Sequence, residues 1–157
     1  MTGHDQAPTF KEMERDGWHE RAGIYDDYAG RLTTEAIARL LDAVSAIPKM
    51  RLLDVCCGPG YGAGQAAALG LNAIGIDIAP AMVAEARHRF PAVEFRVGDA
   101  EELEFSNSSF DAVICPFGLL HLPEPDKAIS EAFRVWGGGG RHCAAQGRVW
   151  YLQQNRC

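Results

Sequence analysis

The first candidate for chemistry in this sequence is a glycine-rich segment that directly follows a short apolar run. Gly58, Gly60 and Gly62 stand at alternate positions after residues 51–56, which have the composition of a buried strand. Glycine lets a ligand approach the backbone closely and permits a tight strand-to-helix turn. The N–H groups that begin the next helix attract an anionic group. We therefore expect Gly58 and Gly60 to contact a ligand, the alternative being a structural turn without one.

Asp77 adds a second candidate contact and leaves two cofactors open. Gly58, Gly60 and Ala63 fit the relaxed dinucleotide fingerprint G-x-G-x-x-G/A. Asp77 follows Gly58 by 19 residues, where a carboxylate that binds ribose hydroxyls is expected. These two features predict a nucleoside-containing cofactor, and they do not distinguish NAD from S-adenosylmethionine.

Alternating strands and helices must position these residues. Periodicity and turn residues predict strands 51–56, 72–77, 93–97 and 110–115 and helices 30–46, 65–69, 80–90 and 126–136. Such alternation is typical of an α/β fold, a doubly wound Rossmann-like parallel sheet with helices on both faces. Its ligands bind at the carboxyl ends of the strands. Asp54, Asp77 and Asp99 all fall at such ends, spaced by 23 and 22 residues.

A family resemblance distinguishes the two cofactors. Residues 52–62 resemble motif I of the class I S-adenosylmethionine-dependent methyltransferases, and Asp54 holds the position of the acidic residue that precedes the glycines. Cys56 stands where the family pattern, D-x-G-x-G-x-G, has its first glycine. The resemblance covers about residues 18–136. This part of the chain is similar to small-molecule methyltransferases of type 11 and of the quinone-biosynthesis kind. It implies S-adenosyl-L-methionine as cofactor.

The resemblance also implies roles for the residues after the second and third predicted strands. Asp77 would bind the ribose hydroxyls, because a carboxylate can accept hydrogen bonds from two adjacent O–H groups. Ile78 and Met82 would flank the adenine, with ordinary core packing as the alternative. The Asp99 side chain and the Ala100 backbone would bind the adenine edge; the alternative for Asp99 is a helix cap.

Three further residues are expected near the methyl group. Residues 110–125, which include Cys115, resemble the strand and loop that border the methyl donor in the family. Tyr25 corresponds to an aromatic residue that covers the cofactor. His121 is a candidate catalytic base, since its ordinary pKa lies near neutrality; a positioning role is the alternative.

The implied function is methyl transfer to a small-molecule acceptor. Because the cofactor carries the reactive methyl group, the protein must mainly orient the acceptor and exclude water. A catalytically silent S-adenosylmethionine-binding module is the alternative, and an NAD-dependent oxidoreductase is less favoured.

The chain divides into a helical leader or cap at residues 1–50, the cofactor-binding core at 51–136 and an atypical tail at 137–157. The family's usual sheet has seven strands, whereas after residue 136 only residues 149–152 suit a strand. We interpret the chain as truncated or frame-shifted after about residue 136, with its carboxyl-terminal strands missing; the alternative is a natural short form with its own terminal structure. The exposed sheet edge would then favour a homodimer.

Composition limits the other classes. The chain has 157 residues, 47% hydrophobic and 23% charged, with a net charge of −6. This predicts one globular core and no attraction to nucleic acid or anionic membranes. No apolar run could span a membrane and the amino terminus is polar, so we expect a cytoplasmic protein. None of the five cysteines forms a CxxC pair, so no metal site is predicted.

Overall fold

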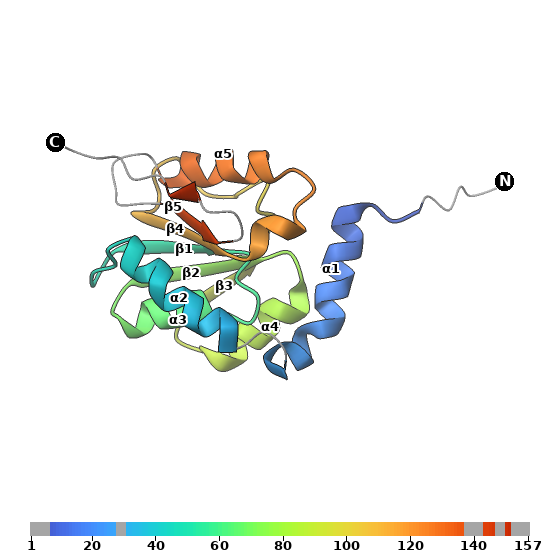
Figure 1. Cartoon of the computed structure of the whole chain (residues 1–157), viewed down its shortest axis with the longest axis horizontal. Coiled ribbons are helices and arrows are strands. Elements are labelled where there is room, and N and C mark those ends of the chain that lie inside the picture. The colour runs from blue at the N-terminus through green and yellow to red at the C-terminus, as the bar shows by residue number, and fades with distance from the viewer. Residues whose placement is uncertain (1–6, 28–30, 137–142, 147–149, 152–157) are drawn as a thin grey trace.

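A six-stranded sheet forms the centre of the protein (Figure 1). The computed structural model describes residues 7–27, 31–136, 143–146 and 150–151. The sheet order is β3-β2-β1-β4-β5-β6, with only β6 antiparallel. The strands are β1 Arg51–Val55, β2 Asn72–Asp77, β3 Glu94–Val97, β4 Ala112–Pro116, β5 Cys143–Gln146 and β6 Trp150–Tyr151.

Helices cover both faces of the sheet, which confirms the doubly wound α/β prediction. They are α1 Phe10–Arg21, α2 Arg31–Ala43, α3 Tyr61–Ala68, α4 Pro80–Arg89 and α5 Pro125–Trp136, with short 3-10 helices η1 Ala22–Ile24 and η3 Gly118–His121. Adjacent strand residues face opposite sides, so Leu52 packs toward Ile37 of α2 while Leu53 packs toward Val135 of α5. Both leucines are fully buried.

The order of strands reverses between β1 and β4, because the chain adds β2 and β3 on one side of β1 and then crosses to the other. The loops after β1 and β4 therefore leave the sheet in divergent directions and open a crevice between them. Doubly wound sheets bind their ligands at this switch point, so the crevice lies where the sequence predicts the cofactor.

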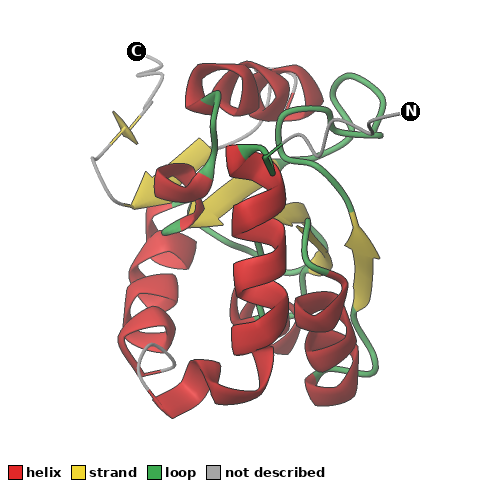
Figure 2. Cartoon of the chain, turned by 90° about the vertical axis from the view of Figure 1, so that its right-hand side faces the viewer, coloured by secondary structure: helices red, strands yellow, loops and turns green. Residues whose placement is uncertain are grey.

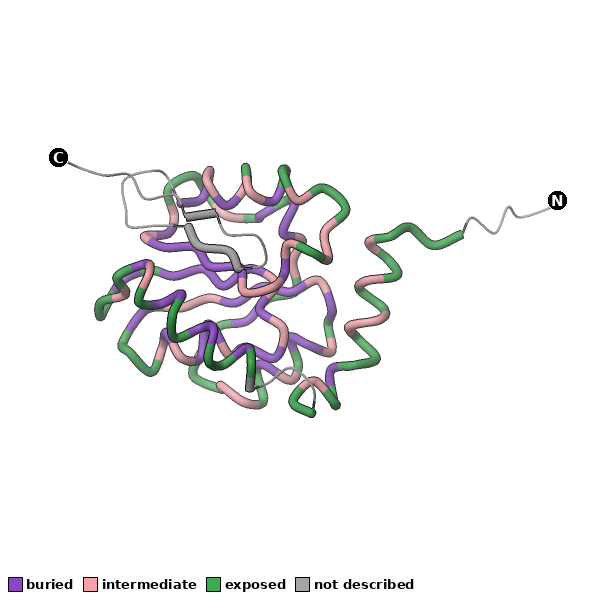
Figure 3. Tube along the Cα trace, in the orientation of Figure 1, coloured by how far each residue is buried: buried purple, intermediate pink, exposed green. Residues whose placement is uncertain are grey.

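Helix α1 lies apart from the layers (Figure 1). It crosses in front of the strands when they are viewed from that side (Figure 2). Thr9 caps its first turn together with Glu12, each side chain bonding the other residue's backbone N–H. None of its residues is buried, in contrast to the central strands β1 and β4 (Figure 3). The expected leader thus contains a capped helix that contributes little to the core.

The described sheet is shorter than the seven-stranded sheet of the family, as predicted, but its carboxyl-terminal part differs from the prediction in one detail. The sequence predicts at most one poor strand after the 126–136 helix, yet β5 pairs with β4 in parallel and β6 pairs with β5. The missed strand, residues 143–146, reads Cys-Ala-Ala-Gln and has no large β-branched or aromatic residue. Pairing with buried β4 overrides that weak propensity. The edge on this side therefore lies at β6, and the homodimer through it stays a prediction.

No helix in the described part of the chain is long and apolar enough to cross a membrane.

Arg134 on α5 ties the loop after β3 to the rest of the fold. Its guanidinium donates hydrogen bonds to the carbonyl oxygens of Leu103 and Phe105 at 2.7 Å and pairs with Glu131. Arg134→Met should lower the free energy of unfolding by about 1–3 kcal/mol, because two partly buried carbonyl groups in the middle of this loop lose their donor. Urea denaturation measures it. Arg39→Met, at an exposed position of α2, is the matched control, and equal losses in both variants would contradict this role.

Candidate functional site

A cavity opens at the carboxyl ends of β1, β2 and β4, beneath α1. Its empty volume, open mouth included, is about 900 Å³. Most sequence-predicted site residues line it: Tyr25, Asp54, Gly58, Asp77, Ile78, Met82, Asp99, Ala100 and His121. One cavity therefore collects residues from five separate segments of the chain.

The glycine loop is held by the carboxylate of Asp54, which is 1% exposed at the end of β1. Its Oδ2 accepts a hydrogen bond of 2.8 Å from the N–H of Ala63 in the first turn of α3. A side chain on Gly62 would lie 2.4 Å from the same oxygen, so only glycine allows this approach. Oδ1 is buried without a hydrogen-bond partner in the described residues. Burial raises the pKa of Asp54 to about 7.

Asp77 holds the other side of the glycine loop. Its two oxygens accept hydrogen bonds from the N–H groups of Gly58 at 2.8 Å and Ala79 at 2.9 Å. Burial raises the pKa of Asp77 despite these backbone donors. Each carboxylate oxygen has a second lone pair, so Asp77 can hold the loop and still accept from two ligand hydroxyls.

Cys56 adopts the conformation of the glycine it replaces in the family pattern. Its φ is +55°, in the left-handed region that a β-carbon disfavours. Its side chain is accommodated because the facing residue, Gly118, has none: a β-carbon there would lie 2.5 Å from Cβ of Cys56. A hydrogen bond to Cys115, together with burial, raises the pKa of the Cys56 thiol. The thiol is therefore a packed, protonated group rather than a nucleophile.

Two predicted contact residues lie outside the cavity lining. Gly60 has a φ of +88°, and a β-carbon on it would lie 2.7 Å from the ring of Phe95 and 2.9 Å from Ala86. This glycine is thus required by packing between the loop and α4. Cys115 is buried in the core between the sheet and α5. It supports Cys56 from behind instead of bordering the cavity.

Asp99 carries an ion pair that the sequence did not predict. Lys11 of α1 lies 2.7 Å from Asp99 and 2.5 Å from Glu101, a carboxylate that is only 2% exposed. Burial acts to lower the pKa of Lys11, but the two hydrogen bonds outweigh it and raise the pKa. The second oxygen of Asp99 accepts from the N–H of Glu101. Asp99 is therefore fixed in place beside Ala100 at the third strand end.

The opposite wall of the cavity combines α1 with the loop after β4. His121 Nδ1 lies 3.0 Å from Glu14, and its ring meets Trp18 edge to face. Tyr25 hydrogen-bonds Thr33 at 2.9 Å and lies near Trp18. Trp18 therefore lies against both His121 and Tyr25.

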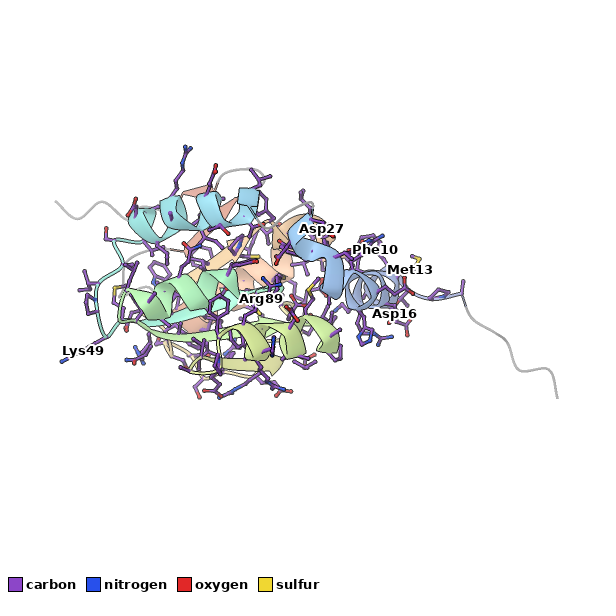
Figure 4. The ribbon with its side chains drawn as sticks, turned by 90° about the horizontal axis from the view of Figure 1, so that it is seen from below. Phe10, Met13, Asp16, Asp27, Lys49 and Arg89 are labelled. Carbon is purple, nitrogen blue, oxygen red and sulfur yellow. The ribbon has the colours of Figure 1, made fainter. Side chains whose placement is uncertain are left out.

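Sequence reasoning missed the contribution of α1 to the cavity. Lys11, Glu14 and Trp18 line it at positions i, i+3 and i+7, one stripe of the helix. Met13 and Asp16 lie on the side of α1 that faces away from the sheet (Figure 4). The capping pair Thr9 and Glu12 predicts a helix start, but the partners of the helix lie 88 to 107 residues away in the chain. Apolar periodicity, the signal that located the other helices, is absent from a stripe of this composition.

No group of three or more histidine, cysteine, aspartate or glutamate side chains in the described residues could hold a metal ion.

Comparison with known proteins agrees with this geometry. Residues 53–144 match the family model described as "Methyltransferase domain". The chain belongs to this family, and its fold is that of the class I S-adenosylmethionine-dependent methyltransferases.

Individual relatives and solved structures add detail to the family match. The chain is 35% identical over 138 residues to a demethylmenaquinone methyltransferase of Renibacterium salmoninarum, covering 81% of this chain and 58% of that protein. It thus spans little more than half the length of this relative. Among solved structures it resembles the [4+2]-cyclase SpnF, with a TM-score of 0.76, 25% identity and coverage of 85% and 58%. The fold also matches magnesium protoporphyrin IX methyltransferase from Synechocystis with bound cofactor, with a TM-score of 0.66, 23% identity and coverage of 82% and 72%.

The raised pKa of Asp54 predicts a pH-dependent stability. The unfolded chain ionises Asp54 near the ordinary aspartate pKa of 3.8, whereas the folded chain keeps this carboxyl protonated until about pH 7. Between these values the folded state binds more protons, so its stability falls as pH rises. Relative to Asp54→Asn, the wild type should lose at most roughly 4 kcal/mol of unfolding free energy from about pH 4 to about pH 7.

Chemical denaturation at several pH values checks this. Asp42→Asn, at an exposed position of α2, is the control and should give a flat difference from the wild type. A flat difference for Asp54→Asn as well would show that the buried carboxyl does not titrate with folding.

The pairing of Cys56 with Gly118 predicts coupled substitutions. Gly118→Ala should cost about 1–3 kcal/mol by overpacking, because its β-carbon would lie within 2.8 Å of Cβ and Sγ of Cys56 and of Sγ of Cys115. Cys56→Gly removes two of these three atoms and should restore much of the loss in the double variant. Unfolding free energies of the four chains measure the coupling, and additive effects would contradict the contact.

Proposed function

We propose that this protein binds S-adenosyl-L-methionine and transfers its methyl group to a small-molecule acceptor. The observation that carries the proposal is the convergence of Asp54, Asp77 and Asp99 with the open glycine Gly58 on one cavity. These residues end β1, β2 and β3 or follow them directly, where doubly wound folds bind nucleoside ligands. The family membership supports the same cofactor.

The residues of the cavity fit the chemical groups of this cofactor. Asp54 Oδ1, buried and without a partner among the described residues, suits the cationic amino group of the methionine moiety. Asp77 would accept from the ribose hydroxyls, and Asp99 from the adenine amino group, with the Ala100 backbone beside it. Apolar contacts to the adenine would come from Ile78 and Met82, both lining the cavity.

The protein's part in the chemistry is positioning. The cofactor supplies an electrophilic methyl group when bound. The chain's own residues must hold an acceptor atom in line with that group and exclude water, which is an effect of proximity and orientation. Tyr25 and Trp18 would cover the site on the side of α1, and His121 would face the acceptor.

The acceptor proposed is a small aromatic or quinone-like molecule. Apart from Glu14, the wall around His121 is largely apolar and aromatic and includes Trp18, Phe117, Leu122 and Pro123. Such a wall suits a flat ring better than a charged or strongly polar acceptor. The demethylmenaquinone methyltransferase relative supports this class.

A second function has one observation in its favour. The similarity to the [4+2]-cyclase SpnF shows that proteins of this fold also carry other activities. The chain would then be a catalytically silent S-adenosylmethionine-binding module with respect to methyl transfer. Both functions need the cofactor cavity, and only a methyl-transfer assay separates them. No residue beyond the glycine loop and Asp77 supports the alternative of an NAD-dependent oxidoreductase.

Gly58 offers a test of cofactor binding that spares the fold. A β-carbon at this position would meet no protein atom within 4 Å, yet Gly58 lines the cavity and has a φ of +52°. Asparagine tolerates this conformation, so Gly58→Asn should fold and obstruct the ligand. Affinity for S-adenosylhomocysteine should fall at least about tenfold, or roughly 1.4 kcal/mol.

Titration calorimetry with S-adenosylhomocysteine, S-adenosylmethionine and NAD measures it. Gly70→Asn is the matched control, because Gly70 also has a positive φ and its β-carbon would meet only Pro48, at 3.4 Å, away from the cavity. NAD binding more tightly than either sulfur compound would overturn the assignment of the cofactor.

A further inference from the structure

His121 is held by two side chains of α1, an element 107 residues earlier in the chain. Its Nδ1 lies 3.0 Å from Oε2 of Glu14. Trp18 donates from its indole N–H to the same oxygen at 3.1 Å. The rings of Trp18 and His121 pack at right angles with centroids 4.9 Å apart. The carboxylate, the indole and the imidazole thus fix one another in a closed triangle.

This arrangement determines which nitrogen of His121 carries the proton. An ionised carboxylate only accepts hydrogen bonds, so Nδ1 must be the donor to Glu14. In the neutral ring Nε2 is then without a proton and is free to accept one. The structure gives Nε2 no protein partner in the described residues. The Nε2 atom of His121 is therefore available to accept a proton, and the His121 side chain lines the cavity.

The position of α1 over the cavity is fixed independently of His121. One turn before Glu14, Lys11 is bound to Asp99 and to buried Glu101. Glu101 is itself tied to the loop after His121, because its other oxygen accepts from the N–H of Glu124 at 2.8 Å. The helix is therefore anchored on both sides of Glu14, by the Lys11 ion pairs and by the packing of Trp18 against the cluster that contains Ala79 and Met82.

We propose that Glu14 is a positioning residue that makes His121 Nε2 the proton acceptor for the methyl acceptor, and that the acceptor carries a neutral O–H on an aromatic ring. The inference rests on the proposed methyl transfer. In the step, the O–H bond breaks and its proton passes to Nε2. The oxygen's electron pair forms the bond to the methyl carbon, and the electron pair of the methyl–sulfur bond goes to sulfur. Glu14 stabilises the imidazolium so formed.

The tautomer of His121 is tested without any turnover. In protein labelled with ¹⁵N-histidine, His121 should show a protonated Nδ1 and a bare Nε2 at about pH 8. Glu14→Leu should move the proton to Nε2, whereas Glu20→Leu, on the opposite side of α1, should change nothing. His121→Asn assigns the signal. A wild-type ring with its proton on Nε2 would overturn the proposal whatever the variants do.

Turnover with two phenols tests the proton transfer and the acceptor class. With labelled S-adenosylmethionine, Glu14→Gln and His121→Asn should each lower kcat for 4-methoxyphenol, which is neutral at the assay pH, by about 10²-fold. The loss for 4-nitrophenol, which is already ionised, should be below about threefold. Equal losses for both phenols, or changes in KM alone, would show a merely structural role.

The outcomes separate this inference from the proposed function. A protein that binds S-adenosylhomocysteine but methylates neither phenol would overturn the acceptor class. A protein that binds no cofactor would overturn the proposed function, while the tautomer measurement would still decide the role of Glu14. Glu20→Gln is the matched control for both phenols and should retain the wild-type kcat.

Discussion

Two buried carboxylates that accept hydrogen bonds from backbone N–H groups are the constraint on which the site depends. Asp54 binds Ala63, and Asp77 binds Gly58 and Ala79. Each carboxylate sits at the end of a central strand and holds a segment that leaves the sheet. Removing these acceptors would leave buried N–H groups unpaired, which costs more than the bond itself contributes. The glycine loop therefore has one conformation before any ligand arrives.

That conformation requires glycine at several positions for packing, and this requirement is separate from contact with a ligand. Glycine at position 62 admits the Asp54 carboxylate, glycine at 60 admits Phe95, and glycine at 118 admits Cys56. Among the four glycines at positions 58, 60, 62 and 64, only Gly58 has open space where a β-carbon would be. A glycine-rich motif thus combines packing and binding requirements. The exchange of glycine for Cys56 is tolerated because the facing position is glycine.

Much of the fold follows from local pattern. Strands β1 and β2 and helices α4 and α5 lie within one or two residues of their predicted bounds, because each has an apolar period or a proline or glycine at its end. Strand β5 could not be predicted, since residues 143–146 form a strand only through pairing with β4. The carboxylates were predictable because they follow strands at a fixed spacing, and strand ends meet at one edge of the sheet.

The rest of the site depends on contacts that no local pattern contains. Gly60 and Cys115 belong to the right motifs, but whether a side chain faces the cavity or the core is decided by the packing of α4 and α5 around them. Helix α1 is the opposite case. The side chains that α1 turns toward the cavity are Lys11, Glu14 and Trp18. Their contact residues are far along the chain, and local sequence does not reveal them: Asp99, Glu101 and His121.

The way α1 is attached bears on how a ligand could reach the cavity. Helices α2 and α5 bury apolar stripes against the sheet, whereas α1 has no buried residue and is held by ion pairs, Trp18 and the short turn that follows it. Buried apolar area contributes in proportion to its extent, and α1 has no buried residue. Displacing α1 would, however, leave the buried carboxylate of Glu101 without its Lys11 partner. A molecule bound beneath α1 would add contacts to Trp18 and Glu14, so occupancy of the cavity and the closed position of the helix would stabilise each other. Under the proposed function, the helix that covers the cavity would therefore also orient His121.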